Sequence, residues 1–293
     1  MRASRSHQLS VRGLQLHLRE WPAEAASDDP ALPPIVILHG WQDTSATWQR
    51  LVDFLPRQRR ILAPDARGFG LSGTAGDTYI FPDYLGDLDG LARAFDLPVF
   101  DLIGHSMGGQ IAALYAGLRS ERVRRLVILD ALHLPLTTPE QAPERLRGWL
   151  DDLTAAPADK TYADYAELAA RIARYHPGLD AQTTAFIARC WAAPAPDGRV
   201  RLLADPRHRQ RGPLLYRDEE ARAVFSQIAA PTLILDAERT NLAGMCPPSV
   251  REERIAAIRN HQRECLADCG HMMHFDRPEA TAQAVMRFLD AAD

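Results

Sequence analysis

Residues 99–118 read VFDLIGHSMGGQIAALYAGL, and this stretch decides the fold. Residues 99–103 are a short apolar run of strand length, and residues 110–118 are good helix formers. Between them, GHSMG (residues 104–108) fits the pattern G-x-S-x-G, which is typical of a sharp strand-to-helix turn. In such a turn the serine hydroxyl is exposed above the sheet, and the glycines let strand and helix pack closely. We therefore predict a strand, a tight turn at Ser106 and a helix.

Composition limits the class of protein. The chain has 293 residues with a formal net charge of −4, which suits one large α/β domain or a core with an insertion. No basic stripe points to nucleic acid, and no apolar run reaches the roughly 18 residues of a membrane span. The first eight residues include two arginines but no apolar segment, so we expect no signal peptide and a cytoplasmic protein.

Strand and helix patterns alternate through most of the chain. Alternating apolar residues over 8–21 predict one or two antiparallel edge strands, and residues 22–34 resemble an exposed loop. Further strands are predicted at 35–38, 60–63, 123–129, 232–235 and 264–267, and helices at 44–55, 82–95, 248–261 and 278–289. This alternation implies an α/β fold with a mostly parallel sheet flanked by helices.

The alternation stops between the strand at 123–129 and the strand at 232–235. Helices are predicted instead at 143–153, 162–175, 181–191 and 219–226. We predict that residues 135–226 form an inserted helical cap, or lid. Residues 1–134 and 227–293 then form the core.

Two other patterns invite a ligand and are set aside. The glycine-rich turn at residues 65–72 lacks the G-K-[ST] ending of a phosphate loop. Cys265, Cys269, His271 and His274 are metal-capable, but their spacing is not that of a usual zinc site. We expect neither a metal nor a cofactor.

Four separate motifs occur in an order that resembles the α/β-hydrolase fold superfamily. They are His39-Gly40, residues 65–72 (DARGFGLS), residues 104–109 (GHSMGG), and Gly270-His271 followed by Arg277-Pro278-Glu279. The resemblance covers about residues 10–130 and 228–290 and leaves the cap uncovered. It implies that Ser106 is the nucleophile and His271 the general base. It also implies that the N–H groups of Met107 and Trp41 form the oxyanion hole.

The acid of the triad departs from the common pattern. In many members of the superfamily it lies about four residues beyond the strand that here reads PTLIL, which falls on Thr240. Three carboxylates remain: Asp130, at the end of the strand after the nucleophile helix, Asp236 and Glu238. A minority of the superfamily places its acid after the earlier strand, so we predict Asp130. The alternative for Asp130 is a structural carboxylate that binds loop amides.

The nucleophile separates reaction classes within the resemblance. Epoxide hydrolases and haloalkane dehalogenases need a carboxylate at position 106, whereas Ser106 supports acyl transfer. We predict hydrolysis of small or medium carboxylic esters through an acyl-enzyme. Lactone, thioester or C–C bond hydrolysis, or ligand binding with little turnover, are the alternatives.

Several aromatic residues and histidines complete the predicted site. Trp41, Trp149 and Trp191 are predicted to contact a small-molecule substrate. His39 and His105 are expected to be structural, and His274 has no assigned role.

Overall fold

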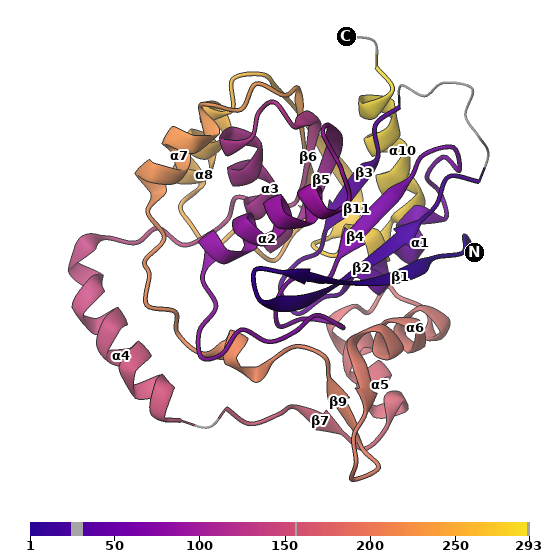
Figure 1. The fold of residues 1–293 in the computed structure, drawn as a ribbon, viewed down its shortest axis with the longest axis vertical. Coiled ribbons are helices and arrows are strands. Elements are labelled where there is room, and N and C mark those ends of the chain that lie inside the picture. Colours follow the sequence, from indigo (N-terminus) through magenta and orange to yellow (C-terminus); the bar gives the residue numbers. More distant parts are fainter. Residues whose placement is uncertain (25–31, 156, 292–293) are drawn as a thin grey trace.

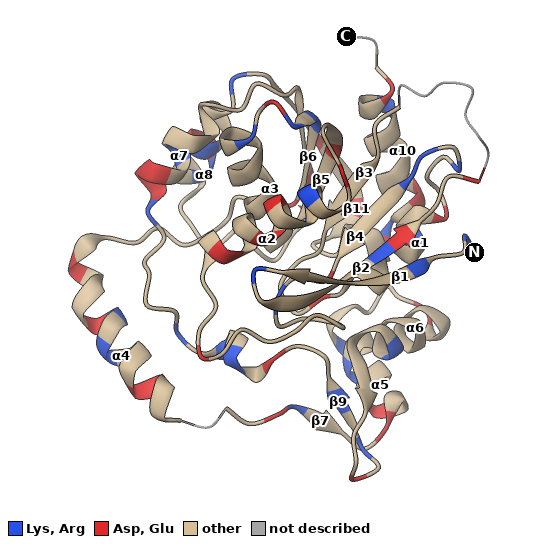
Figure 2. Cartoon of the chain, in the orientation of Figure 1, with Lys and Arg blue, Asp and Glu red and all other residues tan. Residues whose placement is uncertain are grey.

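The computed structural model of the protein describes residues 1–24, 32–155 and 157–291. The exposed loop predicted over 22–34 falls mainly on residues 25–31, which lie outside the described residues. Figure 1 shows a central sheet with helices on both sides, and Figure 2 shows acidic and basic residues interspersed along the chain. Among the described residues, no helix is long and apolar enough to span a membrane.

Eight strands in the described part of the chain form one sheet in the order β1-β2-β4-β3-β5-β6-β10-β11. They are β1 (Arg5–Val11), β2 (Leu14–Trp21), β3 (Ile35–Leu38), β4 (Ile61–Pro64), β5 (Phe100–His105), β6 (Val123–Leu129), β10 (Thr232–Arg239) and β11 (His261–Gly270). β2 pairs antiparallel with β1 and β4, and the other pairs are parallel. The predicted mostly parallel sheet is confirmed.

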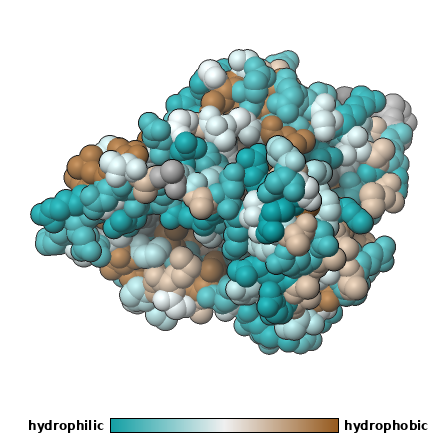
Figure 3. All heavy atoms as spheres, turned by 90° about the horizontal axis from the view of Figure 1, so that it is seen from below, coloured by the Kyte–Doolittle hydropathy of each residue, from teal (hydrophilic) through white to brown (hydrophobic). Residues whose placement is uncertain are grey.

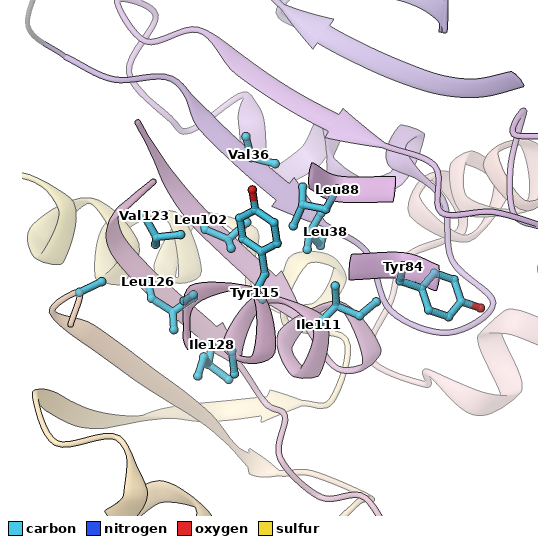
Figure 4. Packing of buried hydrophobic residues seen from close by; sticks show 14 of the residues in the cluster. Val36, Leu38, Tyr84, Leu88, Leu102, Ile111, Tyr115, Val123, Leu126 and Ile128 are labelled. Atoms are coloured by element: carbon cyan, nitrogen blue, oxygen red, sulfur yellow. The ribbon is translucent and has the colours of Figure 1, made fainter. Parts of the chain in front are cut away.

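Helices cover both faces, so the central strands are buried on both sides. On one face lie α2 (Phe81–Ala94), α3 (Met107–Leu118), α7 (Asp218–Phe225) and α8 (Pro248–Ala257), whose side chains share a core with the sheet. Figure 4 shows Tyr115 and Ile111 of α3 packed near Leu102 and Leu38 of the strands. On the other face lie α1 (Gln49–Val52) and α10 (Pro278–Leu289).

The segment between β6 and β10 is more mixed than predicted. It contains α4 (Ala142–Thr154), α5 (Tyr165–Tyr175) and α6 (Ala181–Trp191), but also a small antiparallel sheet. That sheet consists of β7 (Thr161–Tyr162), β8 (Ala192–Pro194) and β9 (Val200–Leu202). The predicted helical cap therefore also contains three short strands, of which only Tyr162 falls within a predicted helix.

Two helices of this segment differ in their surroundings. α4 is mostly exposed, and its Leu146, Leu150 and Leu153 are about half exposed. Figure 3 shows brown apolar surface on the left side of the molecule, where α4 lies in Figure 1. α7 lies within the predicted cap segment but packs against the core helix α3: a Cβ on Gly117 would lie 2.2 Å from the Val224 carbonyl oxygen.

Element ends also differ from the sequence prediction. The helix predicted over 44–55 is a 3₁₀ turn (Ser45–Trp48) followed by the short α1. The helix predicted over 248–261 ends at Ala257. β10 and β11 are longer than predicted and run to Arg239 and Gly270, which brings residues after each strand to one edge of the sheet.

Candidate active site

Ser106 lies at the turn between β5 and α3, with φ of 54° and ψ of −118°. Side-chain-bearing residues rarely adopt this backbone, and such strain persists only where surrounding contacts hold it. Here the Ser106 N–H donates to the Leu129 carbonyl at 3.0 Å, and the Gln110 N–H donates to the Ser106 carbonyl at 3.1 Å. The predicted strand, tight turn and helix are confirmed.

Two glycines allow this turn because strand and helix nearly touch. A Cβ on Gly104 would lie 2.2 Å from the Gly108 carbonyl oxygen. A Cβ on Gly108 would lie 2.4 Å from the Leu38 carbonyl oxygen. Both distances are too short for a real carbon atom, so the motif requires glycine at both positions on steric grounds.

Asp130 follows β6 directly and turns toward His271. Its φ is 41°, its side chain is fully buried, and its Oδ2 lies 2.7 Å from His271 Nδ1. The same oxygen accepts a hydrogen bond from the Thr240 hydroxyl at 2.6 Å, and Oδ1 accepts one from the Ala237 N–H at 3.3 Å. Burial would raise the pKa of Asp130, but the hydrogen bonds from His271 and Thr240 outweigh burial and hold this pKa below its usual value.

His271 follows β11 and is held from two sides. Asp130 binds Nδ1, which leaves Nε2 as the nitrogen directed away from the carboxylate. The His271 carbonyl accepts a hydrogen bond from His105 Nε2 at 2.8 Å, and the two rings lie 4.6 Å apart. Burial and the neighbouring His271 lower the pKa of His105 well below its usual value, so His105 is a neutral donor at physiological pH. Because His105 directly precedes Ser106, this contact fixes His271 beside the turn.

The two alternative acids are engaged elsewhere. Asp236 forms ion pairs with Arg251 and, at 2.6 Å, with Arg263. Glu238 is exposed and accepts a hydrogen bond from the Asp268 N–H at 2.8 Å. The structure therefore brings Asp130, and neither alternative, to His271.

The loop after β3 approaches Ser106 closely. A Cβ on Gly40 would lie 3.2 Å from the Ser106 Cβ, so the loop touches the nucleophile. His39 shapes this loop, since Nδ1 donates to the Gly40 carbonyl at 2.7 Å and Nε2 accepts from the Ala66 N–H at 2.9 Å. The following residue, Trp41, is half exposed.

A cavity of about 170 Å³ lies beside Trp41 and Met107. Trp149 of α4 also lines it and donates its indole N–H to the Thr78 hydroxyl at 3.0 Å. Its other aromatic lining residues are Tyr79, Phe81 and Tyr84. A larger hollow of about 710 Å³ lies between the 68–77 loop and the cap. Neither Ser106 nor His271 lines either space, but the smaller cavity reaches Met107, the residue next to Ser106.

Trp191 does not share this location. It is not among the residues that line the cavity beside Trp41, and its indole N–H donates to Asp43 at 2.8 Å. Its role as a substrate contact stays a prediction. Asp43 and the hydroxyl of Thr240 are two parts of the site that sequence reasoning missed. The only sequence signal for either residue was the threonine at position 240, where many members of the superfamily have the acid of the triad.

Within residues 1–24, 32–155 and 157–291, no group of three or more His, Cys, Asp or Glu is arranged to hold a metal ion. The four cysteines are free thiols. In particular, burial raises the pKa of Cys269 to about 12, so it is a poor thiolate ligand at neutral pH.

Two proteins with hydrolase or hydrolase-like names are similar in sequence to the chain. A zebrafish (Danio rerio) serine hydrolase-like protein is 27% identical over 266 residues, which are 87% of this chain and 81% of that protein. The 2-hydroxy-6-oxo-2,4-heptadienoate hydrolase of Pseudomonas putida is 35% identical over 107 residues, 34% of this chain and 37% of that protein.

A solved structure has the same fold. The structure of a thioesterase domain from the curacin biosynthetic pathway superposes with a TM-score of 0.84 at 24% identity, covering 97% of this chain and 99% of that chain. The sequence model of the α/β hydrolase fold matches residues 33–278. The chain therefore belongs to the α/β hydrolase fold family.

Proposed function

We propose that the protein is a serine hydrolase that cleaves small or medium carboxylic esters through an acyl-enzyme on Ser106. The observation that carries this proposal is the contact of 2.7 Å between His271 Nδ1 and the buried Asp130 carboxylate, beside a strained Ser106. A serine hydroxyl is a weak nucleophile at neutral pH and needs an oriented base within reach.

In the proposed reaction, His271 Nε2 accepts the Ser106 proton as Oγ attacks the ester carbonyl. The N–H groups of Met107 and Trp41 donate to the oxygen of the tetrahedral intermediate. His271 then protonates the leaving alcohol, and the acyl-enzyme forms. Water, deprotonated by His271, releases the acid. Asp130 remains ionised throughout and stabilises the imidazolium, as its lowered pKa favours.

Substrate size is proposed from the cavity beside the predicted oxyanion donors. Its volume of about 170 Å³, enclosed by aromatic and polar side chains, favours a compact group over a long chain. Trp149 forms part of that wall, so we propose that it limits the length of the acyl group.

A second candidate reaction is C–C bond hydrolysis. The partial similarity to the Pseudomonas putida hydrolase supports it, because that enzyme's named substrate is a keto acid rather than an ester. The same Ser106 and His271 would serve, with a carbon leaving group in place of an alcohol. Ligand binding with little turnover is the remaining alternative.

The test compares wild-type protein with Ser106→Ala on p-nitrophenyl acetate, butyrate and octanoate. Ser120→Ala is the matched control, since its hydroxyl lies on an exposed turn and binds the Gln227 carbonyl. We expect hydrolysis that Ser106→Ala abolishes and Ser120→Ala retains, fastest on butyrate or acetate. A fluorophosphonate probe should add once to wild type and not to Ser106→Ala. If the protein cleaves 2-hydroxy-6-oxo-2,4-heptadienoate but shows no serine-dependent ester cleavage, the second candidate replaces the ester proposal.

A further inference from the structure

A second histidine–aspartate pair lies near the proposed triad and has no part in it. His274 belongs to the short helix α9 (Met273–Asp276), and its Nε2 lies 3.0 Å from Asp43 Oδ2. Both side chains are fully buried. The His274 ring is packed against Trp48, with ring centroids 4.3 Å apart. A buried carboxylate is costly unless its oxygens are paired, so this arrangement must be held in place by its partners.

The second oxygen of Asp43 is bound from the cap. Trp191, the last residue of α6, donates its indole N–H to Asp43 Oδ1 at 2.8 Å. The adjacent Thr44 hydroxyl donates to the Cys190 carbonyl at 3.3 Å. Burial would raise the pKa of Asp43, but His274 lowers it below its usual value, so the carboxylate is charged and accepts from both sides. Asp43 therefore connects α9 of the core to α6 of the cap.

Asp43 also closes the turn that carries Trp41. Its N–H donates to the Gly40 carbonyl at 3.2 Å, and Gln42 between them has φ of 60°. A positive φ at a side-chain-bearing residue needs surrounding contacts to persist. The buried carboxylate one residue later supplies such contacts from two directions. Since Gly40 lies against Ser106, any shift of this turn moves the Trp41 N–H relative to the nucleophile.

We propose that Asp43 is a positioning residue for the oxyanion hole. Held by His274 from the core and Trp191 from the cap, it fixes the turn that presents the Trp41 N–H. This inference rests on the proposed function. It also gives Trp191 a role, because its indole ties α6 of the cap to the oxyanion turn.

The test separates transition-state stabilisation from stability. Asp43→Asn keeps the shape but replaces one acceptor oxygen with an amide NH₂, and Trp191→Phe removes only the indole donor. The matched control is Asp101→Asn, a buried aspartate paired with Arg59 and, at 2.6 Å, with Arg124, at the opposite end of β5 from Ser106. The readouts are kcat and KM on p-nitrophenyl butyrate, affinity for butylboronic acid, which forms a tetrahedral adduct on serine, and affinity for butyrate.

Losing one oxyanion donor typically costs about 10²–10³-fold in kcat, and a displaced donor should cost less. We expect Asp43→Asn to lower kcat about 10- to 100-fold, and to weaken boronic acid binding in parallel. KM and butyrate affinity should change less than about threefold. Trp191→Phe should shift the same quantities in the same direction by a smaller factor. Asp101→Asn should lower Tm and leave kcat, KM and both affinities unchanged.

The outcomes distinguish the inference from the proposed function. An active wild type with an Asp43→Asn variant that changes only Tm, as Asp101→Asn does, would overturn the inference alone. Equal losses in boronic acid and butyrate affinity would also overturn it, because the change would then affect ground-state binding. A wild type that neither hydrolyses esters nor binds the boronic acid would refute the proposed function and this inference with it.

Discussion

Thr240→Val removes a hydroxyl that donates to Asp130 while keeping the shape of the side chain. The Thr240 Oγ1 accepts a hydrogen bond from the Leu242 N–H at 3.2 Å, so its own proton is directed to Asp130 Oδ2 at 2.6 Å. His271 Nδ1 binds that same oxygen. Valine therefore leaves the carboxylate with one donor fewer and freer to rotate away from the imidazole.

The size of the effect follows from the charge and burial of Asp130. A hydrogen bond to a charged group contributes about 1.5–3 kcal/mol. If half of this is felt in the transition state, kcat falls about three- to tenfold, since about 1.4 kcal/mol corresponds to a factor of ten. The full loss should lower Tm by about 3–6 °C in a domain of this size.

Low pH should reduce the difference in stability between wild type and Thr240→Val. The folded-state pKa of Asp130 is lowered, so its contribution is present above the unfolded pKa of about 3.9 and is lost as pH falls through the folded pKa. Thr240 is one cause of that lowering, so Thr240→Val has less of this contribution to lose. We expect the Tm gap between wild type and variant to be full at pH 7 and to narrow below about pH 4.

The assay measures initial rates on p-nitrophenyl butyrate and Tm by circular dichroism from pH 7 to pH 3. Thr240→Ser keeps the hydroxyl, so its losses of Tm and kcat relative to wild type should be at most half of those of Thr240→Val. Wild-type kcat in Thr240→Val would refute the claim that the hydroxyl orients Asp130. A Tm gap of the same size at pH 3 and pH 7 would show that the threonine acts through packing and not through the carboxylate.

Three other changes test the site and its turn. Asp130→Asn should lower kcat by about 10³–10⁴-fold. Adding Thr240→Asp to this variant should raise kcat again by at least tenfold, because position 240 already reaches the oxygen that binds His271. A double variant no faster than Asp130→Asn would contradict this expectation. Trp149→Ala should raise kcat/KM for octanoate relative to butyrate by enlarging the cavity of about 170 Å³, and an unchanged ratio would show that this wall does not limit chain length. Gly108→Ala should lower the free energy of unfolding by more than about 3 kcal/mol, because its Cβ overlaps a carbonyl. Gly198→Ala has open space around its Cβ but a φ of 81°, so it should lower the free energy of unfolding by about 1 kcal/mol. Similar denaturation midpoints for the two variants would contradict the steric account.

Local patterns predicted the features that depend on local physics. The turn at Ser106 needs glycine on both sides for steric reasons that a short motif already records. Two buried strands were also predictable, since both are covered on both faces: β3 is apolar throughout, and β5 carries Phe100, Leu102 and Ile103. The short strands of the cap were not visible, because β7 has two residues and β8 and β9 have three each, too few to show a period.

Contacts between residues that are far apart in the chain could not be predicted from the sequence. His274 and Asp43 are separated by 231 positions, and neither lies in a sequence motif that predicts the other as its partner. Trp191 was predicted as a substrate contact because aromatic cap residues often line a pocket. In the structure its indole N–H binds a carboxylate of the loop after β3, a contact that only the assembled fold reveals.

The choice between Asp130 and Asp236 shows how a strand end selects a proposed catalytic residue. Leu129 pairs with Leu235 in the parallel register of β6 and β10, so the two aspartates that follow them stand at equivalent positions on neighbouring strands. β6 ends there, and φ of 41° turns Asp130 toward His271. β10 continues to Arg239, which keeps Asp236 in the strand and beside its arginine partners. When β10 does end, the next residue is Thr240, and it reaches the same carboxylate with a hydroxyl. One imidazole needs one carboxylate at Nδ1, so with Asp130 in that place a neutral donor at position 240 is the better partner, because a second buried negative charge would repel the first.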